Sequence, residues 1–238
     1  MVQFLTEPVP IRLSHSEVLA FQCYFDADAF TIEQALTIPI AFPDSLYRTV
    51  KKRQAEYFAG RICARYALLK LNAEVTQVLT GVKRQPLWPK NKNGKKLVGS
   101  ITHSENIALC IVAEHHKISN LGIDIECHMT EKLAKEIENT VINAVEKQRL
   151  ASVNLAFPEA LTLVFSAKET IFKALFDDVG EHFSFEAAEL LSLDINSCTA
   201  KFALTTTIAA AWPKGRELDI YFQRFSDHLM TYFIQVNV

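Results

Sequence analysis

The sequence predicts an α+β protein made of two similar lobes, each with a long helix and several strands. The length of 238 residues suits one large domain or two small lobes, at roughly 150 residues per domain. Helical and strand-like periodicities occur in both halves of the chain. A composition of 49% hydrophobic and 22% charged residues, with only 7 Gly and 8 Pro, excludes disordered, collagen-like and disulfide-framed proteins. No residue-level repeat relates the two halves.

The first half carries one helix, one loop and two strands. Residues 53–71 place Phe58, Ile62 and Leu68 at helical spacing among good helix formers. Two prolines and two glycines between residues 84 and 99 predict a loop. The apolar run 107–113 and the segment 121–126 then predict two strands joined by a polar turn.

The second half begins with helices and ends with strands. Residues 130–151 form a helical region, either continuous or divided into shorter pieces. A further helix is predicted over residues 158–177, because Pro158 suits the first turn, where a missing N–H costs least. Short β-like runs follow at residues 189–195, 201–208, 218–225 and 230–236.

The charge is distributed unevenly. The net charge is −2, yet residues 48–96 contain thirteen basic and two acidic side chains, a local charge of +11. A basic stretch in an otherwise acidic protein indicates either a solvated basic face or a specific anionic ligand, whereas a general nucleic-acid binder is usually basic overall. We therefore expect no nucleic-acid partner.

Other features concern location. No apolar run approaches the roughly 18 residues of a membrane span. The start of the sequence lacks the pattern of a secretory signal, so a cytoplasmic location is expected. The five cysteines are scattered, without metal-ligand spacing, and are expected to be reduced and mostly buried thiols.

Asp124 and Glu126 alternate with isoleucines on a predicted strand, so both carboxylates point to one face. This pattern is compatible with a polar outer strand face. It is also compatible with a site for a hard divalent cation such as Mg²⁺, which prefers carboxylate oxygens.

The helix over 158–177 contains the sequence Phe165-Ser166-Ala167-Lys168-Glu169-Thr170-Ile171-Phe172-Lys173. Glu169 and Lys173 share one helix face at i,i+4, which by itself indicates a routine ion pair. The combination of the acidic strand and this helix is more specific than either feature alone.

Together these segments resemble the two signature motifs of the 4′-phosphopantetheinyl transferases, in particular the subgroup similar to enterobactin synthase component D. Two features depart from the broad-specificity, surfactin-synthetase-activator type and fit that subgroup. Phe165 stands in place of Trp, and Arg84-Gln85 precedes Pro86. Three further motifs match: Arg53-x-x-x-x-Phe58-Ala59-Gly60-Arg61, Pro86-x-Trp88-Pro89, and Gly99 to Ser104.

The resemblance implies a reaction and a metal site. Such enzymes transfer 4′-phosphopantetheine from coenzyme A to a serine of an apo carrier protein and release adenosine 3′,5′-bisphosphate. Asp124, Glu126 and Glu169 would hold Mg²⁺ against the pyrophosphate, Lys173 would contact the pyrophosphate, and Lys168 would lie near the attacking serine. A general base is required; Glu146 and a metal-bound water are the candidates, and Glu146 could equally be a surface acid.

The resemblance also gives the basic segment a use. Arg53, Arg61, Arg84 and His103 match positions that line the nucleotide end of coenzyme A, whose 3′-phosphate needs cationic donors. The expected coenzyme A contacts are Arg53, Arg61, Arg84, Pro86, Thr102, His103, Asp124, Lys168 and Lys173.

The length matches the fused, pseudo-dimeric members of the family, with the active site between two lobes. We expect an N-terminal lobe over residues 1–120 with the nucleotide contacts, a C-terminal lobe over residues 121–238 with the carboxylates and carrier-facing helices, and a monomer. The expected partner is an aryl or peptidyl carrier domain of a siderophore synthetase, or an acyl carrier protein. The alternatives are a non-catalytic coenzyme A or anion-binding module and, less in keeping with the motifs, a metal-dependent nuclease.

Overall fold

The computed structural model describes residues 4–237. The chain divides into two compact units. The first contains the described residues up to Leu121 together with those from Ile234 onward, and the second spans Gly122–Phe233. Each unit has its own hydrophobic core, its own antiparallel sheet and its own long helix. The predicted α+β class is therefore confirmed.

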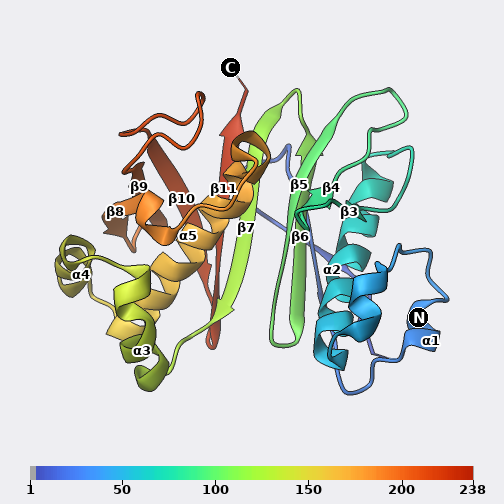
Figure 1. Cartoon of the computed structure of the whole chain (residues 1–238), viewed down its shortest axis with the longest axis horizontal. Helices are drawn as coiled ribbons and strands as arrows, with labels where there is room; N and C mark the ends of the chain where they lie inside the picture. Colours follow the sequence, from blue (N-terminus) through green and yellow to red (C-terminus); the bar gives the residue numbers. More distant parts are fainter. Residues whose placement is uncertain (1–3, 238) are drawn as a thin grey trace. The chain divides into compact units, whose positions relative to one another are not determined.

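The first unit is built on a four-stranded sheet in the order β1-β2-β6-β5. The long helix α2 packs on β2, β5 and β6, and Figure 1 shows it alongside β5 and β6. Its buried face includes Phe58, Ile62 and Leu68, as the periodicity predicts. The elements are β1 (Val9–Ile11), β2 (Leu19–Tyr24), α1 (Ile32–Ala35), a 3₁₀ helix (Asp44–Arg48), α2 (Lys51–Lys70), β5 (Leu97–Ser104) and β6 (Ile107–Glu114).

The segment predicted as a loop, residues 84–99, contains one strand of a small hairpin. Strands β3 (Leu79–Thr80) and β4 (Pro86–Leu87) pair antiparallel, and the last residues of the predicted loop, from Leu97 to Gly99, belong to β5. Arg84 adopts a positive φ of 67° in the turn of this hairpin, so the turn brings an exposed guanidinium next to β4.

The second unit has a five-stranded sheet in the order β7-β11-β10-β9-β8. Helix α5 crosses one face of this sheet, as Figure 1 shows. The predicted helical region at 130–151 is two helices, and the break lies at Ile142 and Asn143. The elements are β7 (Ile118–Cys127), α3 (Glu131–Val141), α4 (Ala144–Ala151), α5 (Phe157–Val179), a 3₁₀ helix (Phe185–Ala187), β8 (Ala188–Asp194), β9 (Thr199–Leu204), β10 (Glu217–Arg224) and β11 (His228–Val236).

Gly122 allows β7 to approach α5 closely. A Cβ atom at this position would overlap the carbonyl oxygen of Thr170 and crowd Ala174, both on α5. Only glycine tolerates such an approach of two backbones. The close packing brings Asp124, two residues further along β7, against the same helix.

None of the helices within residues 4–237 has the length and apolar character needed to cross a membrane.

Candidate active site

Asp124 is the centre of a polar cluster in the second unit. Asp124 is only 3% exposed. It therefore does not lie on a solvated, polar strand face, which was one of the two interpretations of the sequence. The Lys173 ammonium donates to Oδ1 over 2.6 Å, and the Ser166 hydroxyl donates to Oδ2 over 2.8 Å. Both donors lie on α5. The structure thus brings the acidic strand motif and the helical motif into direct contact.

Glu169 interacts electrostatically with this cluster. Burial raises the pKa of Glu169; the Lys173 charge opposes this rise, the Asp124 charge adds to it, and His182 also opposes it. Two carboxylates that repel each other favour a cation between them. The donor chemistry of Asp124 and Glu169 therefore fits a hard divalent ion.

The third predicted metal ligand, Glu126, is half-buried on β7, two residues beyond Asp124. Within the described chain, no three His, Cys, Asp or Glu side chains are already grouped so that they could hold a metal ion. One oxygen of Asp124 is instead neutralised by Lys173. The three predicted metal ligands thus lie on β7 and α5, but their side chains are not grouped around one metal position.

Lys168 and Glu146 form a second, deeper ion pair. Their side chains are 2% and 1% exposed, and the Lys168 Nζ lies 2.8 Å from Glu146 Oε1 and 2.8 Å from the carbonyl oxygen of Val141. Burial lowers the pKa of Lys168, and the hydrogen bond to Glu146 partly offsets that shift.

Glu146 is further fixed by two backbone donors. The N–H of Asn143 donates to Oε2 over 2.9 Å in a capping box at the start of α4, and the N–H of Leu190 on β8 donates to Oε1 over 2.8 Å. The interpretation of Glu146 as a surface acid is therefore wrong. Its sequence context indicates an exposed helix, and its distant partners on α5 and β8 bury it.

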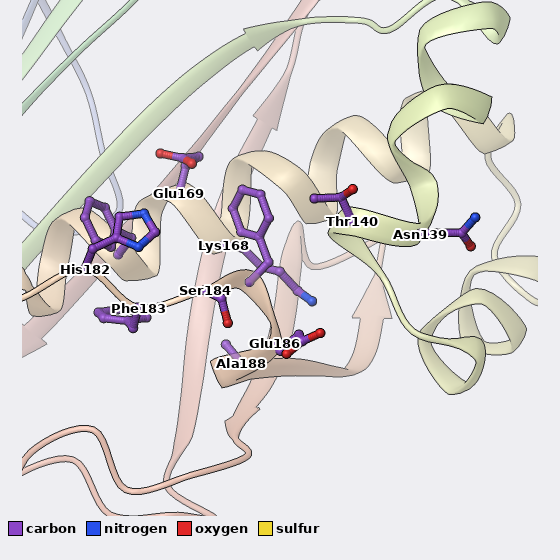
Figure 2. A pocket seen from close by; sticks show the side chains of 11 residues that line it. Asn139, Thr140, Lys168, Glu169, His182, Phe183, Ser184, Glu186 and Ala188 are labelled. Carbon is purple, nitrogen blue, oxygen red and sulfur yellow. The ribbon is translucent and has the colours of Figure 1, made fainter.

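A pocket of about 400 Å³ adjoins these residues (Figure 2). Its wall includes Lys168, Glu169 and Phe172 of α5, and His182 and Phe183 of the segment that follows. The Phe172 ring lies 5.0 Å from the His182 ring and 5.2 Å from the Phe183 ring. The sequence did not identify His182, because a lone histidine in a polar segment carries no motif signal.

In the first unit, α2 and β5 bring Arg53 and His103 together. The Arg53 Nη1 lies 2.8 Å from His103 Nε2, and Glu56 Oε2 lies 3.7 Å from Nδ1. A guanidinium cannot accept a hydrogen bond, so Nε2 must be the acceptor and Nδ1 carries the ring proton. His103 is thereby held as a neutral, oriented imidazole.

Arg61 is buried without an acidic partner within the described residues. It is 8% exposed, its guanidinium lies 4.7 Å from the centre of the Tyr57 ring, and its Nε makes no hydrogen bond within residues 4–237. Its Nη2 donates to the Thr80 hydroxyl over 3.4 Å. A buried cation with an unmet donor favours an anionic ligand.

The other predicted contacts of the first unit are more dispersed. Thr102 is buried on β5 next to His103, Pro86 is half-buried on β4, and Arg84 is exposed in the preceding turn. Within residues 4–237, neither Arg84 nor Pro86 makes a hydrogen bond or ion pair with Arg53, and their place in one ligand site stays a prediction.

Comparison with known proteins covers both units. Residues 42–113 match the 4′-phosphopantetheinyl transferase N-terminal domain, and residues 120–232 match the 4′-phosphopantetheinyl transferase superfamily. Enterobactin synthase component D of Salmonella typhi is 36% identical over 200 residues, which cover 84% of this chain and 79% of that protein. The component D of Escherichia coli is 38% identical over 63% of this chain and 67% of that protein. The 4′-phosphopantetheinyl transferase PptT of Mycobacterium tuberculosis is 29% identical over 75% of this chain and 76% of that protein.

Proposed function

The chain belongs to the 4′-phosphopantetheinyl transferase superfamily, and we propose that it transfers phosphopantetheine from coenzyme A to a serine of an apo carrier protein in siderophore synthesis. The serine oxygen forms a bond to the phosphorus that carries pantetheine, and the bond to the bridging pyrophosphate oxygen breaks. Adenosine 3′,5′-bisphosphate leaves. The contact between Asp124 and Lys173 carries this proposal, because it joins the two motifs of the family at one point.

We propose Asp124, Glu126 and Glu169 as the residues that would hold Mg²⁺. When bound there, the ion would neutralise charge that develops on the phosphoryl oxygens. Lys173 reaches the same point from α5, so its ammonium can pass from Asp124 to a pyrophosphate oxygen. The mutual repulsion of Asp124 and Glu169 supports the cation.

The serine proton needs an acceptor, because a hydroxyl is a weak nucleophile until its proton is removed. Glu169 lies in the wall of the pocket, so a carboxylate oxygen that does not hold the metal is our candidate for this acceptor. We assign Glu146 to holding Lys168 instead, because both of its oxygens already accept hydrogen bonds, one of them from the buried Lys168 ammonium and one from the buried N–H of Leu190.

We also propose a cytoplasmic monomer. The cysteines within residues 4–237 are all free thiols, which is usual in a reducing compartment. Separate cores in the two units support a chain that needs no second copy to fold.

The direct test of the function is intact-protein mass spectrometry. An apo aryl or peptidyl carrier, and separately an apo acyl carrier protein, is incubated with the protein, coenzyme A and Mg²⁺. We expect a mass gain of one phosphopantetheine, abolished by a chelator and restored by added Mg²⁺. Retained coenzyme A binding with no gain on any carrier would instead identify a non-catalytic binding module.

A second prediction concerns Arg61. We propose that its unmet Nε donates to a phosphate of coenzyme A, so Arg61→Met should weaken coenzyme A binding by about 10 to 100-fold. Because a buried, unpaired cation costs stability, the thermal midpoint of the variant should stay level or rise.

Isothermal titration with coenzyme A and with 3′-dephospho-coenzyme A checks this. A larger loss for coenzyme A than for the dephospho form places Arg61 at the 3′-phosphate. Arg65→Met is the matched control, because Arg65 lies one turn further on the same helix and donates to Thr76. Equal losses in the two variants would contradict a specific contact.

A further inference from the structure

Behind Asp124 lies a row of three fully buried hydroxyl groups, and we propose that Thr231 acts through them as a positioning residue for the Asp124 carboxylate. Thr231 lies on β11, outside both signature motifs, while Ser166 and Thr170 lie on α5. All three residues are 0% exposed. The inference rests on the proposed role of Asp124 in the transferase site.

The hydrogen-bond directions follow from the acceptor at the end of the row. An ionised carboxylate only accepts, so the Ser166 hydroxyl donates its proton to Asp124 Oδ2 over 2.8 Å. The Ser166 oxygen then accepts from the Thr231 hydroxyl, 2.9 Å away. The Thr170 hydroxyl lies 2.7 Å from the Thr231 hydroxyl oxygen and donates to the Thr231 carbonyl oxygen over 3.1 Å, so it packs against β11 at the far end of the row. The Ser166 and Thr231 hydroxyls thus direct their protons toward Asp124.

The hydrogen bonds made by serine and threonine side chains of α5 indicate that this row is not a chance group of core hydroxyls. A serine or threonine inside a helix commonly donates to the carbonyl four residues earlier. Thr162 does so, donating to the carbonyl oxygen of Pro158 over 2.7 Å. Ser166 and Thr170, one and two turns later, make their hydrogen bonds across to β7 and β11 instead. Their hydroxyls are directed to the Asp124 side of the helix.

The Asp124 carboxylate is therefore held at both of its oxygens by side chains of helix α5. Lys173 holds Oδ1 and the hydroxyl row holds Oδ2, so the carboxylate plane is set before any ligand arrives. Hydrogen bonds in a row polarise one another, which strengthens the final bond to the anion. Loss of such an orienting partner typically costs 10 to 100-fold in metal affinity or activity.

The test compares Thr231→Val with Thr162→Val. Both substitutions remove one buried threonine hydroxyl and keep the shape, but within the described residues the Thr162 hydroxyl forms hydrogen bonds with the backbone of Pro158 and Met129 alone. We expect similar falls in thermal midpoint for the two variants. Only Thr231→Val should weaken Mn²⁺ binding, measured by electron paramagnetic resonance with coenzyme A present, by 10-fold or more. Thr231→Ser should restore it.

Ser166→Ala provides a second route should Thr231→Val fold poorly, and it should weaken Mn²⁺ binding at least as much. Equal Mn²⁺ affinity in Thr231→Val and Thr162→Val, with the wild type binding Mn²⁺ and modifying a carrier, would overturn the inference alone. A wild type that binds no Mn²⁺ and modifies no carrier would overturn the proposed function itself.

Discussion

Asp124→Asn is expected to lower kcat/KM for carrier modification by about 10³-fold. The amide keeps the size of the carboxylate but removes the charge that attracts a cation, and one of its two polar atoms becomes a donor facing Lys173 or Ser166. A bound metal contributes several kcal/mol to the transition state, and each 1.36 kcal/mol corresponds to about tenfold in rate.

Single-turnover transfer to an apo carrier, followed over a series of Mg²⁺ concentrations, measures this effect. Glu159→Gln is the matched control, because Glu159 is an acid of the same helix α5 that pairs with Arg224 on β10. Its transfer rate should stay within twofold of the wild type. An Asp124→Asn variant with a rate within fivefold of the wild type would remove Asp124 from the proposed metal site.

Local patterns predicted the elements that carry strong periodicity or breakers. The helices over 53–71 and 158–177 and the strand at 107–113 were found because apolar spacing or a continuous apolar run marks them. Strands β1 and β2 were not predicted, because neither shows a clean alternation of apolar and polar residues.

The sequence predicted the candidate site only at residues that belong to a recognised motif. The motif residues Asp124 and Lys173 are 49 residues apart, yet the resemblance paired them, and the structure places them in contact. Thr231 and the buried state of Glu146 were missed for one physical reason. Their partners lie on other elements, 65 residues away for Ser166 and 44 for Leu190, and no local pattern reports such contacts.

Glu146→Gln is expected to lower the free energy of unfolding by about 3 to 5 kcal/mol, because it leaves the Lys168 ammonium buried and without its counter-charge. At roughly 2 to 4 °C per kcal/mol for a chain of this size, the thermal midpoint should fall by about 6 to 20 °C. Urea unfolding with and without the substitution measures the change. The surface pair of Lys147 and Glu138 gives the control, since Glu138→Gln should cost under about 1 kcal/mol.

The double variant Glu146→Gln, Lys168→Met distinguishes two roles of Glu146, that of a partner in a buried ion pair and that of a general base. Replacing both charges of a buried pair by uncharged groups of similar size is often neutral, so the double variant should regain most of the lost stability. A general base would behave differently. Its loss would cut kcat by about 10² to 10⁴ with little change in unfolding free energy, and removal of Lys168 would restore neither quantity. Unchanged stability in Glu146→Gln, with kcat lost, would therefore return Glu146 to the role of proton acceptor. The expected destabilisation would leave that role to Glu169, whose carboxylate faces the pocket.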